Sequence, residues 1–255
     1  MDTQNESKLK RMLDVHSPGT VSLAKWLEAF GISRELQKVY RKSGWLEKVG
    51  PGALKRTGDP VSWQGGLYAM QQQARLPVHA GALTALSMQG LAHYFRMTEE
   101  TIFLFSPRKK ILPRWFKDYS WGYPVQHFKT DFLPLGLGVT PHEGKNFSIT
   151  ISTPERAIME CLYLAPGKLD LVESYHLMEG LANLRPKIVE QLLTSCESVK
   201  VKRLFLFMAN KARHQWLTFV DQKKIDLGTG DRSIVKGGAY NSDFRISIPK
   251  ELASL

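Results

Sequence analysis

The first 60 residues alternate between short amphipathic stretches and turn residues. Apolar side chains recur at helical spacing in segments 5–16, 20–30 and 34–43, which predicts three short helices. Segment 45–57 then holds two short runs around Gly-Pro-Gly, which predicts a β-hairpin. Three helices followed directly by a hairpin predict a winged helix-turn-helix domain.

Turn and capping residues set the limits of these helices. We expect Thr20 to cap the second helix and Gly31 to end it. Ser33 is placed to cap the third helix, and Gly44 is placed to close it.

Beyond residue 60 the pattern changes to a mixture of helices and strands. Segment 58–63 reads as a linker, so we expect a winged helix-turn-helix domain over 1–60 and a larger domain over 61–255. The second domain is predicted to be mixed α+β, which makes the whole chain α+β, although its topology does not follow from the pattern. Its predicted elements are helices at 62–74 and 79–90, strands at 101–107 and 145–153, strands and irregular loops over 113–135, helices over 153–219, and an extended, glycine-rich final stretch of 35 residues.

Composition is that of a globular protein with a basic surface. Hydrophobic residues make up 43% of the chain and charged residues 23%. The net charge of +11 favours a polyanionic partner, either nucleic acid or an anionic membrane face. The two cysteines, Cys161 and Cys196, lie in apolar segments and are expected to be buried free thiols in a reducing compartment. With neither a signal-like N-terminus nor a membrane-spanning stretch, the expected location is the cytoplasm.

The third predicted helix carries long polar side chains opposite an apolar stripe. Segment 1–57 holds eleven Lys and Arg against six Asp and Glu, which is five of the eleven net positive charges of the chain. The expected polar face comprises Arg34, Gln37, Lys38 and Arg41, and the expected apolar stripe comprises Leu36, Val39 and Tyr40. Such a helix can seat its apolar side on the domain and present donors to base edges.

Basic residues on the flanking elements extend this surface. A wing would place its lysines and arginines on backbone phosphates, and the second helix would touch the flanking backbone. The candidate DNA-binding residues are therefore Lys25, Arg34, Gln37, Lys38, Arg41, Lys42, Lys48, Lys55 and Arg56.

Patterns typical of catalysis are weak, and the sequence predicts neither an enzyme nor a cofactor or metal site. The histidines form no H-E-x-x-H motif. "GTGDRS" (228–233) lacks the ending of a phosphate loop, and "LGLGV" (135–139) lacks the third glycine of a dinucleotide fingerprint. A nuclease-like arrangement stays open for one set of residues, namely Asp221, Asp226 and Asp231 with Lys223 and Lys224.

A second basic stretch lies at 198–213. Its charged residues are a candidate second polyanion or partner surface, or else a solvated rim around buried Leu204, Phe207 and Met208. The solvated rim is the favoured reading, and the charged residues concerned are Lys200, Arg203, Lys211 and Arg213.

Four phrases of the larger domain are distinctive in their order and spacing. In "ISTPERAIMECL" (151–162), Thr153 and Pro154 form a strong helix start, with Glu155 and Arg156 in the first turn as capping and ion-pair residues. The other phrases are "HAGALTALSMQGLAHYF" (79–95), "IFLFSPRKKILPRWF" (102–116) and "IVKGGAYNSDFRISIP" (234–249). Together with the winged helix, they resemble the AbiEi family of antitoxins from bacterial abortive-infection toxin–antitoxin operons. The resemblance covers nearly the whole chain.

This resemblance implies a function in phage defence. The N-terminal domain would bind inverted repeats in the promoter of its own operon and repress transcription. The larger domain would counter a neighbouring nucleotidyltransferase-type toxin, with direct binding between the two left open. The resemblance supplies no residues for toxin neutralisation. It leaves two alternatives, a nucleic-acid enzyme or a ligand-responsive regulator in the second domain. Two copies on DNA are implied, as monomers bound cooperatively or as a dimer.

Overall fold

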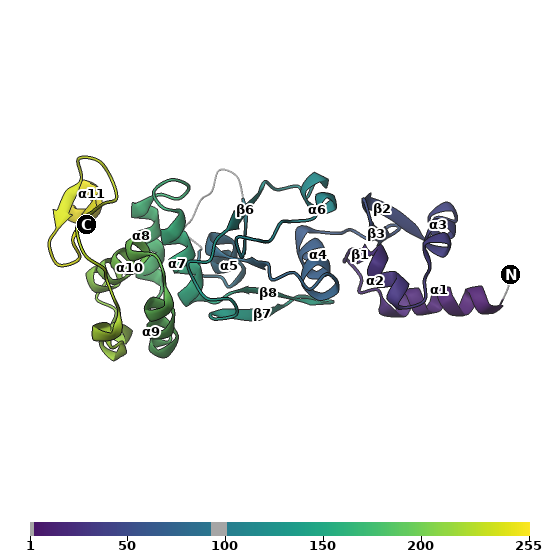
Figure 1. Cartoon of the computed structure of the whole chain (residues 1–255), viewed down its shortest axis with the longest axis horizontal. Helices are drawn as coiled ribbons and strands as arrows, with labels where there is room; N and C mark the ends of the chain where they lie inside the picture. Colours follow the sequence, from purple (N-terminus) through teal and green to yellow (C-terminus); the bar gives the residue numbers. More distant parts are fainter. Residues whose placement is uncertain (1–2, 93–100) are drawn as a thin grey trace.

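The computed structural model describes residues 3–92 and 101–255, with side chains from Lys8 onward. The molecule is elongated, with the N-terminal helices at one end and the C-terminal helix at the other (Figure 1). Between them lies a mixed sheet flanked by helices, so the predicted α+β class is confirmed.

The N-terminal end has the element order of a winged helix-turn-helix. It contains three helices and a three-stranded antiparallel sheet in the order β1-β3-β2. The elements are α1 (Thr3–Val15), β1 (Ser22–Leu23), α2 (Ala24–Ala29), α3 (Arg34–Lys42), β2 (Leu46–Gly50) and β3 (Ala53–Arg56). A small apolar core holds them together, formed by Met12, Leu27, Ile32, Tyr40, Leu46 and Leu54.

Capping at the turn between α2 and α3 follows the expected pattern. Gly31 has a φ of +80°, which L side chains rarely adopt, and the hydroxyl of Ser33 accepts a hydrogen bond from the Leu36 amide at 3.3 Å. Gly44 (φ +76°) follows the end of α3, also as predicted.

The start of the second helix differs from the prediction. Thr20 does not cap it, because its hydroxyl donates to the carbonyl of Ser17 instead. Ser22 and Leu23 form β1 and pair with Leu54 and Ala53 of the hairpin, so α2 begins only at Ala24. The apolar pattern of this short stretch is compatible with either a strand or a helix. Pairing with the hairpin sets the boundary between β1 and α2.

The larger part is built on a five-stranded mixed sheet in the order β6-β5-β4-β8-β7. β5 and β6 run parallel, as do β4 and β8, while the β4–β5 and β7–β8 pairs are antiparallel. The strands are β4 (His79–Ala80), β5 (Ile102–Ser106), β6 (Val125–Lys129), β7 (Val139–Glu143) and β8 (Ser148–Ser152). Before and between them lie α4 (Trp63–Tyr68) with a π-helical turn (Ala69–Gln73), α5 (Ala82–Met88) and α6 (Arg114–Asp118).

Two sequence predictions need correction in this region. His79 and Ala80 do not begin a helix but form the central strand β4, because both pair with β5 and Ala80 also pairs with β8. Segment 113–135, predicted as strands and loops, also contains the helix α6. The end of the phrase 79–95 lies outside the described residues.

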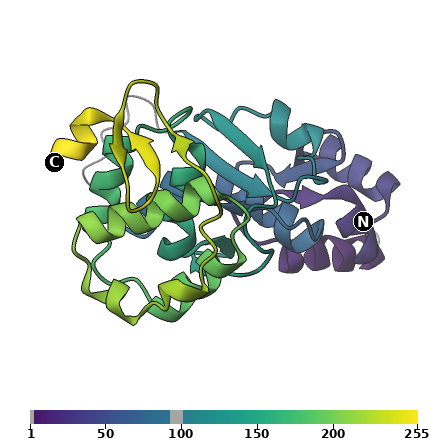
Figure 2. The ribbon, with the colours of Figure 1, turned by 60° about the vertical axis from the view of Figure 1, so that its left-hand side comes forward.

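The C-terminal part adds a group of helices and a second small sheet (Figure 2). Its helices are α7 (Pro154–Leu164), α8 (Leu171–Gly180), α9 (Pro186–Ser195), α10 (Val199–Lys211) and α11 (Lys250–Ser254), with 3₁₀ turns at Gln215–Phe219 and Gln222–Lys224. The small sheet, in the order β10-β11-β9, comprises β9 (Arg232–Ser233), β10 (Ala239–Asn241) and β11 (Ile246–Ile248). Thr153 occupies the N-cap of α7 as predicted, but its hydroxyl forms no capping hydrogen bond.

Two basic side chains of α10 bind main-chain carbonyls of other segments, which neither sequence interpretation of this helix predicted. Arg203 is 1% exposed, and its guanidinium donates to the carbonyls of Leu227, Gly228, Gly230 and Arg245. The Lys200 ammonium donates to the carbonyls of Tyr163 and Ala165 at 2.7 and 2.6 Å. Both cations are therefore engaged by main-chain carbonyls, Arg203 inside the protein and Lys200 in a partly buried position.

The winged helix packs directly on the larger part of the molecule. The Gln73 side chain donates to the Val21 carbonyl at 2.8 Å and accepts from the Leu23 amide at 2.7 Å. Gly50 of the hairpin lies so close to α6 that an added Cβ would stand 2.7 Å from the Cβ of Trp115. The wing is therefore held against α6 rather than hanging free.

Other expectations concern single groups. Both cysteines are buried and unpaired, as predicted, and burial raises the pKa of the Cys196 thiol to about 11. Within residues 3–92 and 101–255, no helix is long and apolar enough to cross a membrane.

Candidate nucleic-acid interface

Helix α3 presents three basic side chains along one exposed face. Arg34, Lys38 and Arg41 are exposed and stand at i, i+4 and i+7. The Arg34 guanidinium forms an ion pair with Glu28 of α2 at 2.7 Å, with both side chains at least one-third exposed. Because an exposed ion pair of this kind contributes little stability, it does not prevent Arg34 from moving to a phosphate.

Gln37 does not belong to this face, which corrects the sequence prediction. The residue is 3% exposed, and its amide donates to the carbonyls of Ala24 and Ile32 at 2.9 and 2.8 Å. Both amide hydrogens are thereby used inside the domain. Gln37 fixes α3 against α2 and cannot reach a base edge in this conformation.

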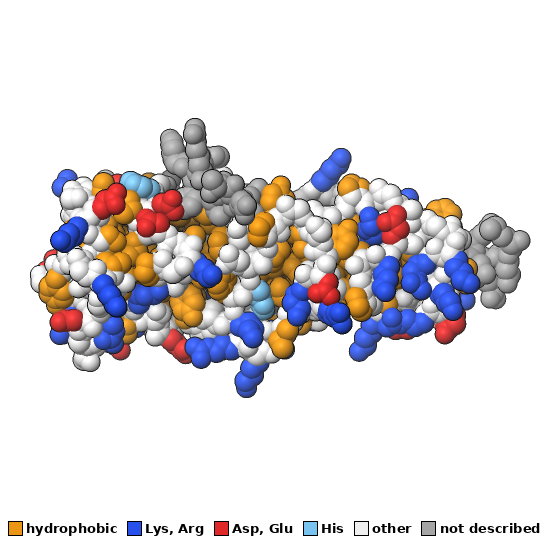
Figure 3. Space-filling view, turned by 90° about the horizontal axis from the view of Figure 1, so that it is seen from above, with side chains coloured by type: hydrophobic (Ala, Val, Ile, Leu, Met, Phe, Trp, Pro, Cys, Tyr) orange, Lys and Arg blue, Asp and Glu red, His pale blue; other side chains and the backbone are white. Residues whose placement is uncertain are grey.

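The hairpin and α3 enclose a shallow hollow of about 240 Å³. Three cations of α3 and one of β2 meet there, beside the glycines at the wing turn. The residues lining it are Ala24, Arg34, Gln37, Lys38, Arg41, Lys48, Gly50, Gly52 and Leu54. Gly52 has a φ of +73°, so the wing turn needs glycine at this position. Seen from above, lysine and arginine side chains gather over the N-terminal part of the molecule (Figure 3).

The remaining candidate residues lie outside this hollow. Lys25 on α2 and Lys42 at the end of α3 are exposed. Lys55 pairs with Glu47 across the hairpin at 3.2 Å, and it and Arg56 lie near the end of β3 away from the wing turn. The structure therefore gathers Arg34, Lys38, Arg41 and Lys48, but not the other predicted positions.

Two exposed apolar side chains on or next to α3 were not predicted to be exposed by the sequence interpretation. Val39, assigned to the apolar stripe, is 53% exposed, and Trp45 directly after α3 is 42% exposed. The true buried side of α3 is formed by Gln37 and Tyr40, with Leu36 partly buried. A tryptophan amid the charges of "KSGWLEK" was a signal for an exposed aromatic group, because few apolar neighbours lie near it in sequence.

The predicted nuclease-like residues are not gathered into one site. Asp231 pairs with Arg245 at 3.0 Å, Asp226 accepts from the Gly228 amide, and Asp221 lies beside Lys224. Across the part of the chain that the structure describes, no three His, Cys, Asp or Glu side chains are placed to hold a metal ion.

Comparisons with known proteins bear on the chain as a whole. Residues 5–97 match the family described as transcriptional regulator, AbiEi antitoxin N-terminal domain. Residues 99–249 match the family described as transcriptional regulator, AbiEi antitoxin, type IV TA system. The chain belongs to the AbiEi antitoxin family. The resemblance read from the four sequence phrases and the winged helix is thus confirmed, and the protein is a transcriptional regulator of the kind found in type IV toxin–antitoxin systems.

A solved structure agrees with this AbiEi-family fold. The RV2827C protein from Mycobacterium tuberculosis, known from a crystal structure, superposes with a TM-score of 0.59 at 12% sequence identity. The match covers 96% of this chain and 92% of that one. At this identity the likeness extends to the fold alone. No curated protein matches the sequence.

Proposed function

We propose that this AbiEi-family antitoxin represses its own operon by binding inverted repeats in the promoter through α3 and the hairpin. The observation that carries the proposal is the hollow in which Arg34, Lys38, Arg41 and Lys48 meet. Helix α3 would lie in the major groove, where its arginines reach guanine edges or phosphates, and Lys48 in the wing would bind the adjacent backbone. Two monomers would occupy the two repeats cooperatively.

The division of labour that we propose falls near residue 60. Residues 1–60 would carry DNA binding, while 61–255 would neutralise a nucleotidyltransferase-type toxin without catalysis, with direct binding between the two left open. The family description, which is that of a regulator and antitoxin, supports this reading over the enzyme alternative. The dispersal of Asp221, Asp226 and Asp231 also disfavours a nuclease centre at those residues.

A reporter gene behind the operon's own promoter tests the repressor half. We expect wild type to repress it and Arg34→Ala/Arg41→Ala to lose at least tenfold in repression, because each arginine contact contributes about 1–3 kcal/mol to binding. The matched control is Lys168→Ala/Lys187→Ala, which removes two exposed charges from the larger part and should repress like wild type. Equal repression by the arginine variant and wild type would contradict the proposal.

The same arginine variant separates the two halves of the function. Co-expressed with the operon's toxin from an independent promoter, it should still protect cells, because neutralisation is assigned to the larger part. Loss of protection, with unchanged protein levels, would place neutralisation on the winged helix instead.

A further inference from the structure

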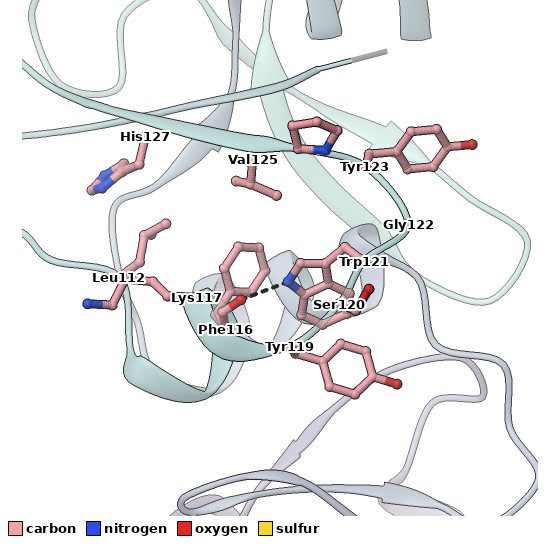
Figure 4. A pocket seen from close by; sticks show the side chains of 11 residues that line it. Leu112, Phe116, Lys117, Tyr119, Ser120, Trp121, Gly122, Tyr123, Val125 and His127 are labelled. Atoms are coloured by element: carbon pink, nitrogen blue, oxygen red, sulfur yellow. Dashed lines mark hydrogen bonds between the residues drawn. The ribbon is translucent and has the colours of Figure 1, made fainter. Parts of the chain in front are cut away.

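A second surface, on the larger part of the molecule, combines aromatic rings with exposed cations. A groove of about 590 Å³ lies between α6 and β6. This volume is within the usual range for sites that take a ligand of nucleotide size. Besides Pro124, the groove is lined by the ten residues labelled in Figure 4, which are Leu112, Phe116, Lys117, Tyr119, Ser120, Trp121, Gly122, Tyr123, Val125 and His127.

The two ends of the groove differ in chemistry. The Lys117 ammonium and the His127 ring lie at one end, and the rings of Tyr119 and Tyr123 lie at the other (Figure 4). The rings of Phe116 and Trp121 fill the space between them and form the apolar floor. One end can therefore receive an anion, while the other offers flat surfaces for an aromatic ring.

The floor is buried, whereas the outer ring is exposed. Trp121 is 8% exposed, and its indole donates to the carbonyl of Phe116 at 2.8 Å. Tyr123, in contrast, is 46% exposed and leaves a large apolar face in solvent. Stacking of a base on such a ring contributes about 1–3 kcal/mol and is possible for every base.

Exposed basic side chains are frequent on the segments next to the groove, although only Lys117 lines it. Six exposed cations occur on the β5–α6 segment and at the end of β6, namely Arg108, Lys109, Lys110, Arg114, Lys117 and Lys129. Two of them have carboxylate partners, Arg114 with Asp118 and, more loosely, Arg108 with Asp131. The four lysines form no ion pair with any described residue. Because Ser106 of β5 pairs with Lys129 of β6, the 108–110 loop starts beside Lys129.

The pKa of His127 reflects its burial and the positive charge of the nearby lysines. Burial, together with the charges of Lys129 and Lys117, lowers the pKa of His127 to about 4. The imidazole is therefore neutral at pH 7 and lies 2.8 Å from the Ser106 hydroxyl. A bound phosphate near these two lysines would offset their charge and raise this pKa.

We propose that the groove between α6 and β6 binds single-stranded nucleic acid, with a base stacked on Tyr123 and a neighbouring phosphate held by Lys117. A groove that takes one flat ring suits an unpaired base, since the bases of a duplex are stacked inside the helix. This activity goes beyond repression, which uses duplex DNA on α3 and the hairpin.

The test uses the full chain with the winged helix disabled by Arg34→Ala/Arg41→Ala. Fluorescein-labelled decathymidylate is titrated onto this protein at several salt concentrations. We expect Tyr123→Ala in this background to weaken binding fivefold or more. Lys117→Ala should weaken it as well and reduce the salt slope by about 0.7, the value for one phosphate contact on a single strand. Decathymidylate should also raise the NMR-measured pKa of His127.

Matched controls distinguish binding at the groove from non-specific binding to exposed aromatic or basic side chains. Phe219→Ala removes an aromatic ring that is 76% exposed, and Lys187→Ala removes an exposed lysine elsewhere, so both should bind like the parent. An abasic decamer, which keeps the phosphates, should bind at least fivefold more weakly than decathymidylate. Equal binding of the abasic decamer, preference for a duplex, equal losses in the controls, or absence of binding would each overturn the proposal. None of these outcomes bears on the repressor function, because the winged helix is already disabled.

Discussion

Replacement of Glu160 by glutamine is expected to lower the free energy of unfolding by about 3–5 kcal/mol at neutral pH. Glu160 is fully buried, and both of its carboxylate oxygens are used. Oε1 lies 2.9 Å from His79 Nε2 and accepts from Arg156 Nε at 2.8 Å. Oε2 accepts from the Ala82 amide at 2.9 Å and the Ser152 hydroxyl at 2.8 Å. A neutral side chain would leave the buried Arg156 without its counter-charge.

The pH dependence of this effect follows from the Glu160 pKa. Burial alone would raise the pKa, but His79 and Arg156 and the Ala82 hydrogen bond outweigh burial and lower it from 4.5 to about 2. A carboxyl group whose pKa is depressed on folding stabilises the protein above its unfolded pKa and loses this contribution as the pH falls through its folded pKa. The difference in stability between wild type and Glu160→Gln should therefore shrink between about pH 4.5 and pH 2.

Chemical denaturation followed by tryptophan fluorescence measures the loss of unfolding free energy in Glu160→Gln, both at neutral pH and as a function of pH. The matched control is Glu179→Gln, which removes a carboxylate paired with His176 at 2.9 Å on the surface, where both side chains are about half exposed. This change should cost less than about 1 kcal/mol. A Glu160 variant as stable as the control would show that the buried network contributes little.

Replacement of Arg203 by methionine is the second large expected effect. The change leaves the carbonyls of Leu227, Gly228, Gly230 and Arg245 without their donor inside the protein. Since a hydrogen bond to a charged group contributes about 1.5–3 kcal/mol, the loss of several together should lower stability by at least about 3 kcal/mol. The loss should be largest in the segment that Arg203 ties to α10.

Hydrogen exchange can localise this second effect. Amides of β9, β10 and β11 should exchange faster in Arg203→Met, while those of the five-stranded sheet change less. Arg232→Met, which removes an exposed arginine from the same segment, serves as the control. Faster amide exchange over the whole chain, or no change in exchange at all, would contradict a local stabilising role for Arg203.

The winged helix could be predicted from the sequence because its signals are local. Capping at Ser33, the glycines at 31 and 44, and the Gly-Pro-Gly turn act within a few residues, and each is found where expected. Gln37 could not be placed in this way. Its polarity favoured the outer face, but it satisfies carbonyls of Ala24 and Ile32 that come together only in the folded domain.

The larger part depended on contacts between distant segments. Arg203 was expected at the surface because a helical pattern with five basic residues resembles a charged rim. Only the fold brings the 227–230 and 245 carbonyls around it. Likewise, β4 is too short to be read as a strand, and it exists because β5 and β8 pair with it from either side.

The central claim is that the cations lining the hollow between α3 and the hairpin bind operator DNA. The most direct test titrates the purified protein onto its own promoter and onto scrambled duplex over a range of salt concentrations, beside Arg34→Ala/Arg41→Ala. We predict that wild type prefers the promoter and that the variant binds more weakly, with a salt slope reduced by about 1.8 per bound monomer, or 0.9 for each lost phosphate contact. Equal affinity and equal slope for the two proteins would contradict the account, because these side chains would then form only a solvated surface.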